Sequence, residues 1–142
     1  KRAGRRKPGR KRLMVRQADC CCGDATIDVK GEPAIHAVCH CNNCKARTGS
    51  AFGISAYFNN DQILKISGET KIYAVHSVGE QERHFCPRCG TLLYWTYDYY
   101  NNMTGIAGGC FTQEPLGEPT MTVCNADKYP WVTLPENWEI YP

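Results

Sequence analysis

Residues 86–90 read Cys-Pro-Arg-Cys-Gly, and this short stretch limits the folds that the chain can adopt. Two cysteines separated by two residues, with a glycine after them that tolerates a tight backbone, form the turn typical of a zinc knuckle. Such a turn supplies two sulfur ligands and needs two more from elsewhere in the chain. The other eight of the ten cysteines are therefore candidates for the missing pair.

A second cysteine pair lies near the start of the chain, at Cys20 and Cys22, with Cys21 between them. In an extended strand, residues i and i+2 point to the same face. We therefore expect the sulfurs of Cys20 and Cys22 to lie together, with that of Cys21 pointing away. With Cys86 and Cys89 they make four thiolates, the number that a closed tetrahedral zinc site requires.

Three further cysteines, Cys39, Cys41 and Cys44, lie within six residues. Strand alternation places Cys39 and Cys41 on one face and turns His40 away, although His40 could lend a fourth ligand. Three thiolates leave one coordination position open for water or a substrate, which is the arrangement of a catalytic zinc. The sequence therefore predicts two Zn²⁺ per chain, one in a closed site and one in a site with an open coordination position.

Two other interpretations of the cysteines stay open. A redox pair of the thioredoxin type could lie at 41–44 or 86–89, although neither stretch joins a strand to a long helix. A single structural zinc could instead use a different quartet and leave the other thiols inert. Cys21, Cys110 and Cys124 are expected to be small buried apolar residues.

The charge of the chain is divided between a short basic segment and an acidic remainder. The 142 residues carry a formal net charge of +3, but eight of the 17 Lys and Arg side chains lie in residues 1–12. Residues 13–142 hold 9 basic and 14 acidic residues, a net charge of −5. We expect residues 1–14 to form a flexible basic tail that could contact nucleic acid, and residues 15–142 to form a single domain.

The hydropathy pattern indicates a cytoplasmic protein. No stretch approaches the ~20 apolar residues of a membrane-spanning helix, so no membrane partner is expected. Residues 13–15 are too short an apolar run for a secretory signal. In a reducing compartment, clustered cysteines bind metal more often than they form disulfides.

Short stretches of alternating apolar and polar residues recur after the tail and predict an all-β fold. Nine candidate strands lie at residues 25–30, 35–38, 52–57, 63–67, 71–75, 83–85, 91–96, 104–107 and 120–123. Helix is expected only as a turn or two near residues 42–46. The pattern is typical of an irregular β-sandwich or barrel of short strands, here organised around the two zinc sites.

The joint spacing of seven cysteines resembles that of the glutathione-dependent formaldehyde-activating enzyme family, which also includes the centromere protein V group. The matching stretches are Cys20-x-Cys22-Gly23, Cys39-His40-Cys41-x-x-Cys44 with Thr48-Gly49-Ser50-Ala51-Phe52, and Phe85-Cys86-x-x-Cys89-Gly90-Thr91. The resemblance runs from about Asp19 to Trp131, and Trp131 to Pro135 matches the closing Trp and Leu-Pro pattern of the family.

This resemblance implies an irregular β-sandwich built around two zinc ions. It assigns the structural zinc to Cys20, Cys22, Cys86 and Cys89, and the catalytic zinc to Cys39, Cys41 and Cys44. It also implies carbon–sulfur lyase chemistry, represented by the reversible joining of glutathione and formaldehyde as S-hydroxymethylglutathione. A small thiol and an aldehyde are the partners that follow from that chemistry.

Residues directly after the open cluster are candidates for substrate contacts. Zn²⁺ with three thiolates carries a net charge of −1, so the cations Lys45 and Arg47 could ease the binding of an anionic thiol. The hydroxyl and backbone N–H groups of Thr48, Gly49 and Ser50 could bind a carboxylate or a developing oxyanion, or could simply form a turn. The alternative function is a non-catalytic zinc module that binds a thiol, a protein or nucleic acid.

Overall fold

The computed structural model describes residues 13–142, so the basic segment 1–12 and its predicted contact with nucleic acid lie outside the described residues. Met14, predicted as part of the tail, is attached to the folded chain because its carbonyl accepts a hydrogen bond from the Gly31 N–H (2.8 Å). Within residues 13–142, no helix is long and apolar enough to cross a membrane.

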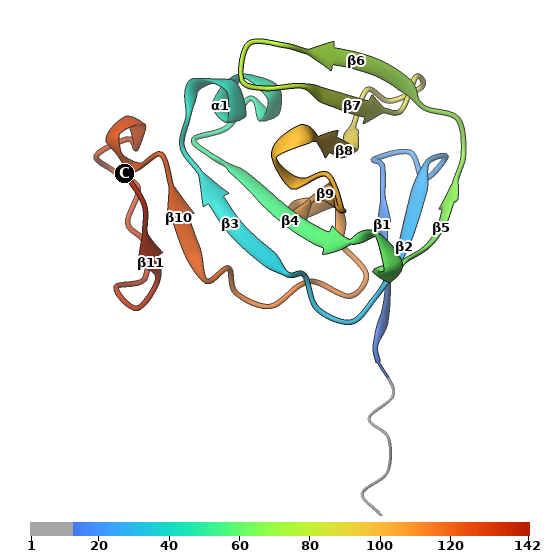
Figure 1. Ribbon diagram of the computed structural model, residues 1–142, viewed down its shortest axis with the longest axis horizontal. Helices are drawn as coiled ribbons and strands as arrows, with labels where there is room; N and C mark the ends of the chain where they lie inside the picture. Colours follow the sequence, from blue (N-terminus) through green and yellow to red (C-terminus); the bar gives the residue numbers. More distant parts are fainter. Residues whose placement is uncertain (1–12) are drawn as a thin grey trace, which may run out of the picture.

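The described residues form short strands connected by tight turns (Figure 1). The strands are β1 (Val15–Asp19), β2 (Thr26–Lys30), β3 (Ile35–Cys39), β4 (Gly53–Asn59), β5 (Ile63–Ser67), β6 (Lys71–Val75), β7 (Gln81–Phe85), β8 (Leu92–Tyr97), β9 (Met103–Ala107), β10 (Met121–Val123) and β11 (Glu139–Ile140). The helical elements are α1 (Asn42–Thr48) and the 3₁₀ turns η1 (Asn60–Gln62), η2 (Asp98–Tyr100), η3 (Gly108–Cys110) and η4 (Asn125–Asp127). The predicted all-β class with little helix is confirmed.

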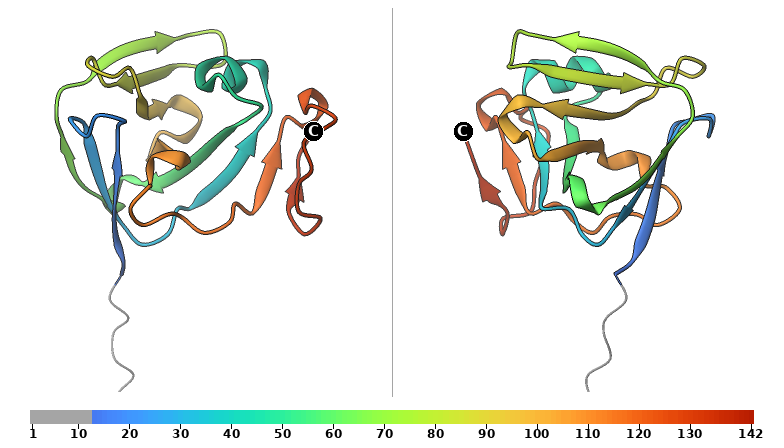
Figure 2. Two further views of the ribbon diagram at one scale, coloured as in Figure 1. Left: turned by 180° about the vertical axis from the view of Figure 1, so that it is seen from behind. Right: turned by 45° about the vertical axis from the view of Figure 1, so that its right-hand side comes forward.

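Two sheets pack against each other. The smaller sheet has the order β1-β2-β5, and the larger has the order β11-β10-β3-β4-β9-β8-β7-β6. In Figures 1 and 2 the larger sheet curls round from β10 to β6, and the smaller sheet lies on the side where β5 leads into β6. Fully buried side chains from both sheets, including Ile27, Phe58, Leu93 and Ile106, form one core between them.

Strand β3 is central to the site because it pairs with two strands that run in opposite directions. β3 pairs antiparallel with β4, while β10 pairs parallel with β3 on its other edge and places Met121 beside Ala37 and Val123 beside Cys39. Side chains at alternate positions of neighbouring strands share a face. The residues before Cys39 and those of β10 therefore form one continuous surface.

All nine predicted strands form, each within two residues of its expected ends, and α1 covers the predicted helical turn. Two strands were not predicted. The inward positions of β1 are Arg16 and Ala18, and the charged Arg16 hides the alternation; its buried side chain donates to Gly31 O (3.3 Å) and Glu32 Oε1 (3.0 Å). β11 is only two residues long and both are exposed, so it has no apolar pattern to detect.

Candidate metal centres and the adjoining cavity

Four cysteine sulfurs meet where the turn between β1 and β2 faces the turn between β7 and β8. The Sγ atoms of Cys20, Cys22, Cys86 and Cys89 all lie within 4.8 Å of one another. Two of these distances are 3.6 Å, from Cys20 to Cys22, and 3.7 Å, from Cys22 to Cys86. Sulfur atoms on a tetrahedral zinc with bonds of ~2.3 Å are about 3.8 Å apart. The spacing and the chemistry of this donor set therefore fit a zinc ion.

The two turns of the four-cysteine cluster are built alike. The Gly23 N–H donates to Cys20 O (3.0 Å), and the Gly90 N–H donates to Cys86 O (2.8 Å). Both glycines have a left-handed backbone, with φ of +83° and +80°, which other residues rarely adopt. The predicted strand geometry for Cys20 and Cys22 is wrong. These residues lie in the turn after β1, and its curl brings their sulfurs together.

Hydrogen bonds hold the sulfurs of this cluster in place. The Ala25 N–H donates to Cys20 Sγ (3.2 Å), and the Thr91 hydroxyl lies 3.3 Å from Cys89 Sγ. Hydrogen bonds from the hydroxyl and the backbone N–H of Thr91 lower the pKa of Cys89 to about 5. Thr91 Oγ1 also accepts from the Cys21 N–H (3.0 Å), so one side chain joins the two turns.

The second group of cysteines lies where β3 ends and α1 begins (Figure 1). The Sγ atoms of Cys39, Cys41 and Cys44 lie within 4.8 Å of one another, and no fourth His, Cys, Asp or Glu of residues 13–142 completes the group. Cys41 precedes α1, and its sulfur accepts from the Cys44 N–H (3.3 Å). The predicted strand pairing of Cys39 with Cys41 is thus replaced by the first turn of a helix.

His40 points away from these sulfurs, toward β10. Its side chain is fully buried, and its Nε2 lies 3.0 Å from Thr122 Oγ1. Burial lowers the pKa of His40, which favours the neutral imidazole. His40 therefore fixes the start of the three-cysteine segment against the neighbouring strand and does not join the ligand group.

A cavity of about 400 Å³ adjoins the three-cysteine cluster. Its walls come from β3, β4, α1, β10, the β6–β7 turn and the residues around η2. The lining residues are Ile35, Ala37, Cys39, Cys41, Asn43, Cys44, Ser55, Tyr57, Val78, Gln81, Tyr97, Tyr100, Met121, Val123 and Cys124. Thiols, aliphatic groups and aromatic rings make up most of this lining, and no Lys, Arg, His, Asp or Glu of residues 13–142 belongs to it.

Two arginines lie near the cluster, behind the cavity lining. The guanidinium of Arg47 stacks on the ring of Trp95 (4.7 Å to its centre) and donates to Ser55 Oγ (3.5 Å). Arg83 is buried and donates to Asn43 Oδ1 (2.9 Å). Within residues 13–142 neither arginine pairs with a carboxylate. Their positive charges therefore face the cysteine cluster without an acidic partner.

The charge on the cluster is centred on Cys44. A hydrogen bond with Cys39 lowers the pKa of Cys44 to about 5, and the charge of Arg47 acts in the same direction. The same hydrogen bond raises the pKa of Cys39, which acts as its donor. Burial and the charge of Arg47 lower the pKa of Arg83, while the negative charge of Cys44 opposes that shift. The thiolates and the two guanidinium groups thus stabilise one another.

Tyr57 lines the cavity and carries a hydroxyl group that can donate a hydrogen bond. Its oxygen accepts a hydrogen bond from Trp95 Nε1 (3.0 Å), and burial raises the pKa of Tyr57 to about 12. The tyrosine is therefore neutral at physiological pH. No acceptor for its proton lies within hydrogen-bonding distance among residues 13–142. A ligand oxygen in the cavity can fill that role.

Most of the predicted substrate contacts lie elsewhere. Lys45, Gly49 and Ser50 line a different, shallower hollow on the far side of α1, together with Tyr129 and Trp131. The Lys45 ammonium lies 4.0 Å from the ring centre of Tyr129. The helix turns Lys45 away from the cavity because neighbouring positions are about 100° apart around its axis.

The remaining predicted contacts have local structural roles or lie beside the cluster. The Thr48 hydroxyl donates to Cys44 O (2.8 Å), and Gly49 ends α1 with φ of +63°. Arg47 is three residues after Cys44, on the same side of the helix, and is the one predicted cation near the cluster. Sequence reasoning missed Arg83 and Tyr57, which come from strands far from the motif.

The three cysteines expected to be buried differ from one another. Cys21 is exposed, so the prediction is wrong for it: in the turn its side chain points outward. Cys110 is half-buried and packs against the core. Cys124 is half-buried, lines the cavity and has a left-handed φ of +54°.

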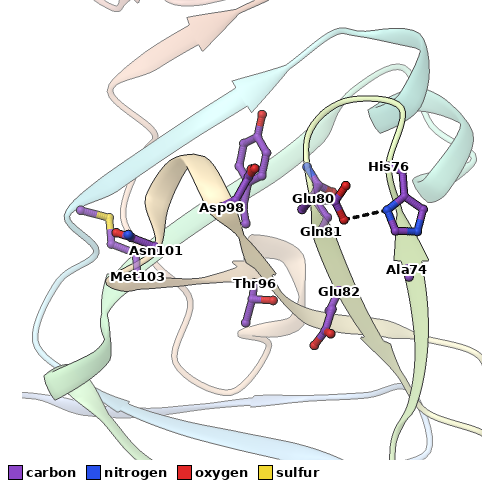
Figure 3. Close-up of a pocket in the computed structure, with 10 residues that line it drawn as sticks. Ala74, His76, Glu80, Gln81, Glu82, Thr96, Asp98, Asn101 and Met103 are labelled. Carbon is purple, nitrogen blue, oxygen red and sulfur yellow. Dashed lines mark hydrogen bonds and ion pairs between the residues drawn. The ribbon is translucent and has the colours of Figure 1, made fainter.

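An acidic hollow of about 340 Å³ adjoins the cavity (Figure 3). Gln81 and Tyr97 line both spaces. The hollow is lined by three carboxylates and one imidazole, those of Glu80, Glu82, Asp98 and His76, and His76 Nδ1 lies 2.7 Å from Glu80 Oε2. The surface beside the cavity is therefore negatively charged.

Comparison with known proteins points to one family. Residues 15–127 match the family described as glutathione-dependent formaldehyde-activating enzyme. A Fusarium vanettenii protein, provisionally named as the same enzyme, is 27% identical over 89 residues, which are 61% of this chain and 48% of that protein. The chain thus matches about half the length of that relative. A crystal structure of a Rhodobacter sphaeroides protein shares the fold, with a TM-score of 0.54, 19% identity and coverage of 68% of this chain and 87% of that one.

Proposed function

The chain belongs to the glutathione-dependent formaldehyde-activating enzyme family, and on that premise we propose that it makes and breaks the carbon–sulfur bond of thiol–aldehyde adducts. The observation that carries this proposal is the three-cysteine cluster, which offers three sulfur ligands and adjoins a cavity. The family name supplies glutathione and formaldehyde as the reference substrates, with S-hydroxymethylglutathione as their adduct. In enzyme terms this is a carbon–sulfur lyase.

Two zinc ions per chain form part of this proposal. Cys20, Cys22, Cys86 and Cys89 would hold a structural ion, and Cys39, Cys41 and Cys44 a catalytic one. A zinc ion with an open position supplies Lewis-acid chemistry, which favours the thiolate form of a substrate sulfur at neutral pH. The charges of the residues around the three-cysteine cluster then determine which fourth ligand is stable.

The charges near the three-cysteine cluster favour an anionic fourth ligand. Three thiolates and Zn²⁺ sum to −1, and a substrate thiolate brings the total to −2. Arg47 and Arg83 contribute +2 and have no carboxylate partner within residues 13–142. Buried charges are costly unless they are balanced. The site therefore reaches neutrality when the ligand is a thiolate.

The chain supplies a hydrogen-bond donor for the oxygen of the adduct. In the cleavage direction the carbon–sulfur bond breaks, its electron pair stays on sulfur, the hydroxyl proton leaves to water, and a carbonyl forms. In the reverse direction the thiolate adds to the carbonyl carbon and the oxygen gains negative charge. We assign Tyr57 to stabilise that charge, because its hydroxyl proton is free and its pKa of about 12 keeps it protonated.

The test measures exchange between free and thiol-bound formaldehyde by NMR on protein that contains two zinc ions. We expect exchange of the glutathione adduct, or of a simpler thiol adduct, to exceed the spontaneous rate. Cys44→Ser should abolish the excess, while the matched variant Cys110→Ser should retain it. Two-zinc protein that binds thiols without accelerating exchange with any of them would identify a binding module instead.

A further inference from the structure

The walls of the cavity are unlike a site for a highly charged thiol. We propose that the preferred thiol substrate carries an uncharged, apolar group and is not glutathione, a refinement that rests on the proposed thiol–aldehyde chemistry. Three observations support it: the lining beside the cysteines, the engagement of the polar groups, and the charge of the adjoining hollow.

The first observation is an apolar strip that leads to the cysteine cluster. Ile35 and Ala37 precede Cys39 at alternate positions of β3, and the parallel pairing with β10 sets Met121 beside Ala37 and Val123 beside Cys39. A substrate whose sulfur lies near Cys39 therefore has its attached group against aliphatic carbon. Contact with an apolar group removes hydrocarbon surface from water, which favours binding.

Aromatic rings form the next part of the lining. The rings of Tyr57 and Tyr100 are 4.8 Å apart, and those of Tyr97 and Tyr100 are 6.0 Å apart, measured between their centres. All three tyrosines line the cavity. Aromatic faces contact flat or branched apolar groups well. A cavity of about 400 Å³ with this lining is of the size that accepts a small aryl or alkyl thiol.

The second observation is that three side-chain oxygens of the lining already accept hydrogen bonds from the two arginines. Asn43 Oδ1 and Gln81 Oε1 accept from Arg83 (2.9 and 3.4 Å), and Ser55 Oγ accepts from Arg47 (3.5 Å). The two arginines lie behind these side chains and do not line the cavity. Their positive charges balance the negative charges of the cysteine thiolates, but the two guanidinium groups do not reach a substrate carboxylate that lies further from the cysteines.

Glutathione presents two carboxylates and one ammonium group at neutral pH. Each would need a partner in the cavity, because a charge that leaves water without one is strongly disfavoured. Apart from the cysteine thiolates, no ionisable Lys, Arg, His, Asp or Glu side chain of residues 13–142 lines the cavity. The third observation adds to this energetic cost: the carboxylates of Glu80, Glu82 and Asp98 line the adjoining hollow (Figure 3), and their negative charges repel those of glutathione.

The experiment uses the full chain loaded with Co²⁺, whose sulfur-to-metal absorption bands report a new thiolate ligand. Phenylmethanethiol and glutathione are titrated separately, and their affinities are compared at equal thiolate concentration. We expect phenylmethanethiol to bind at least about tenfold more tightly, which is about 1.4 kcal/mol. Glutathione binding as tightly or more tightly would overturn the inference, while leaving the thiol chemistry intact. Absence of a band change with every thiol would overturn the proposed function itself.

A charge placed in the wall gives an independent measurement. Met121→Lys should strengthen glutathione binding and weaken that of phenylmethanethiol, so the ratio of the two affinities should move at least about tenfold toward glutathione. Leu64→Lys is the matched control, because Leu64 is exposed on β5 and does not line the cavity. An unchanged ratio in correctly folded Met121→Lys protein would contradict the inference.

Discussion

The two cysteine clusters use the same ligand atom but differ in how the chain brings the sulfurs together. The four-cysteine cluster joins two turns, and Cys22 and Cys86, whose sulfurs are 3.7 Å apart, are 64 residues apart in sequence. The three-cysteine cluster comes from one segment at the start of α1. Ligands from distant segments stabilise a fold because they close a long loop. Ligands from one segment close only a short loop and therefore stabilise the fold less.

The surroundings of the two cysteine clusters also differ. In the four-cysteine cluster, Cys22 and Cys89 are exposed, and the sulfurs form hydrogen bonds with neighbouring atoms of the turns. Cys44 is buried next to the cavity and near two guanidinium groups, neither of which pairs with a carboxylate of residues 13–142. The cavity and the two nearby guanidinium groups distinguish the three-cysteine cluster from the four-cysteine cluster, and the predictions below test that distinction.

The largest effect is expected from Cys86→Ser. Loss of one ligand from the four-cysteine cluster should leave the chain unfolded, because structural zinc contributes on the order of 10 kcal/mol to folding. Circular dichroism and metal content measured together should show loss of both structure and zinc. Cys110→Ser is the control. A folded Cys86→Ser protein that retains two zinc ions would contradict the structural role of this cluster.

Cys44→Ser should remove the metal of the three-cysteine cluster and leave that of the four-cysteine cluster in place. We expect one zinc per chain in place of two, a cooperative thermal transition, and exchange activity reduced at least about a hundredfold. Zinc release to a chromogenic chelator after denaturation gives the stoichiometry. Unfolding comparable to that of Cys86→Ser would show that both clusters support the fold.

Acidification should remove the two metals at different pH values. Protons compete with metal for thiolates, so affinity falls as the pH falls. The three-cysteine cluster offers one sulfur fewer, and we expect it to lose its zinc first. Chelator titrations at a series of pH values, with Cys44→Ser protein marking the remaining site, measure the order. Simultaneous release would contradict the proposed difference.

Arg83→Gln should weaken thiolate binding at the three-cysteine cluster by about ten- to a hundredfold, because one balancing charge is lost. The cobalt titration measures this affinity and also shows whether the metal is retained. Arg88→Gln is the matched control, since Arg88 pairs with Asp24 (3.2 Å) at the exposed edge of the other cluster. Equal effects of the two substitutions would remove the role given to Arg83.

The smallest of these effects is expected from Tyr57→Phe. It should lower kcat about tenfold and leave the KM for the thiol nearly unchanged, because the lost hydrogen bond forms to the oxygen of the adduct. With a pKa of about 12, Tyr57 should cause no decline in rate between about pH 8 and 10. Larger changes in KM than in kcat would assign Tyr57 to thiol binding.

The sequence predicts the strands and the two cysteine groups well, because alternation and ligand spacing are local properties. It places Cys20 and Cys22 in the wrong local geometry, since a two-residue separation brings sulfurs together in a turn as well as in a strand. It also misses β1, where the buried Arg16 interrupts the apolar pattern.

Local sequence patterns do not predict which residues surround the three-cysteine cluster. Arg83 and Tyr57 come from β7 and β4, and only the assembled sheet brings them near Cys44. Helical periodicity does favour Arg47 over Lys45, because positions i and i+3 share a face. Applied to the short predicted helix, it would have separated these two candidates.

The 64-residue interval between Cys22 and Cys86 also has a consequence for biosynthesis. On the ribosome, the first turn emerges well before the second, so the four-cysteine site can be completed only after four of the eight strands of the larger sheet have been synthesised. The three-cysteine site is complete as soon as one short segment has emerged. Zinc supply during translation should therefore govern the yield of folded chain through its later site, while the earlier site can fill without waiting for the rest of the protein.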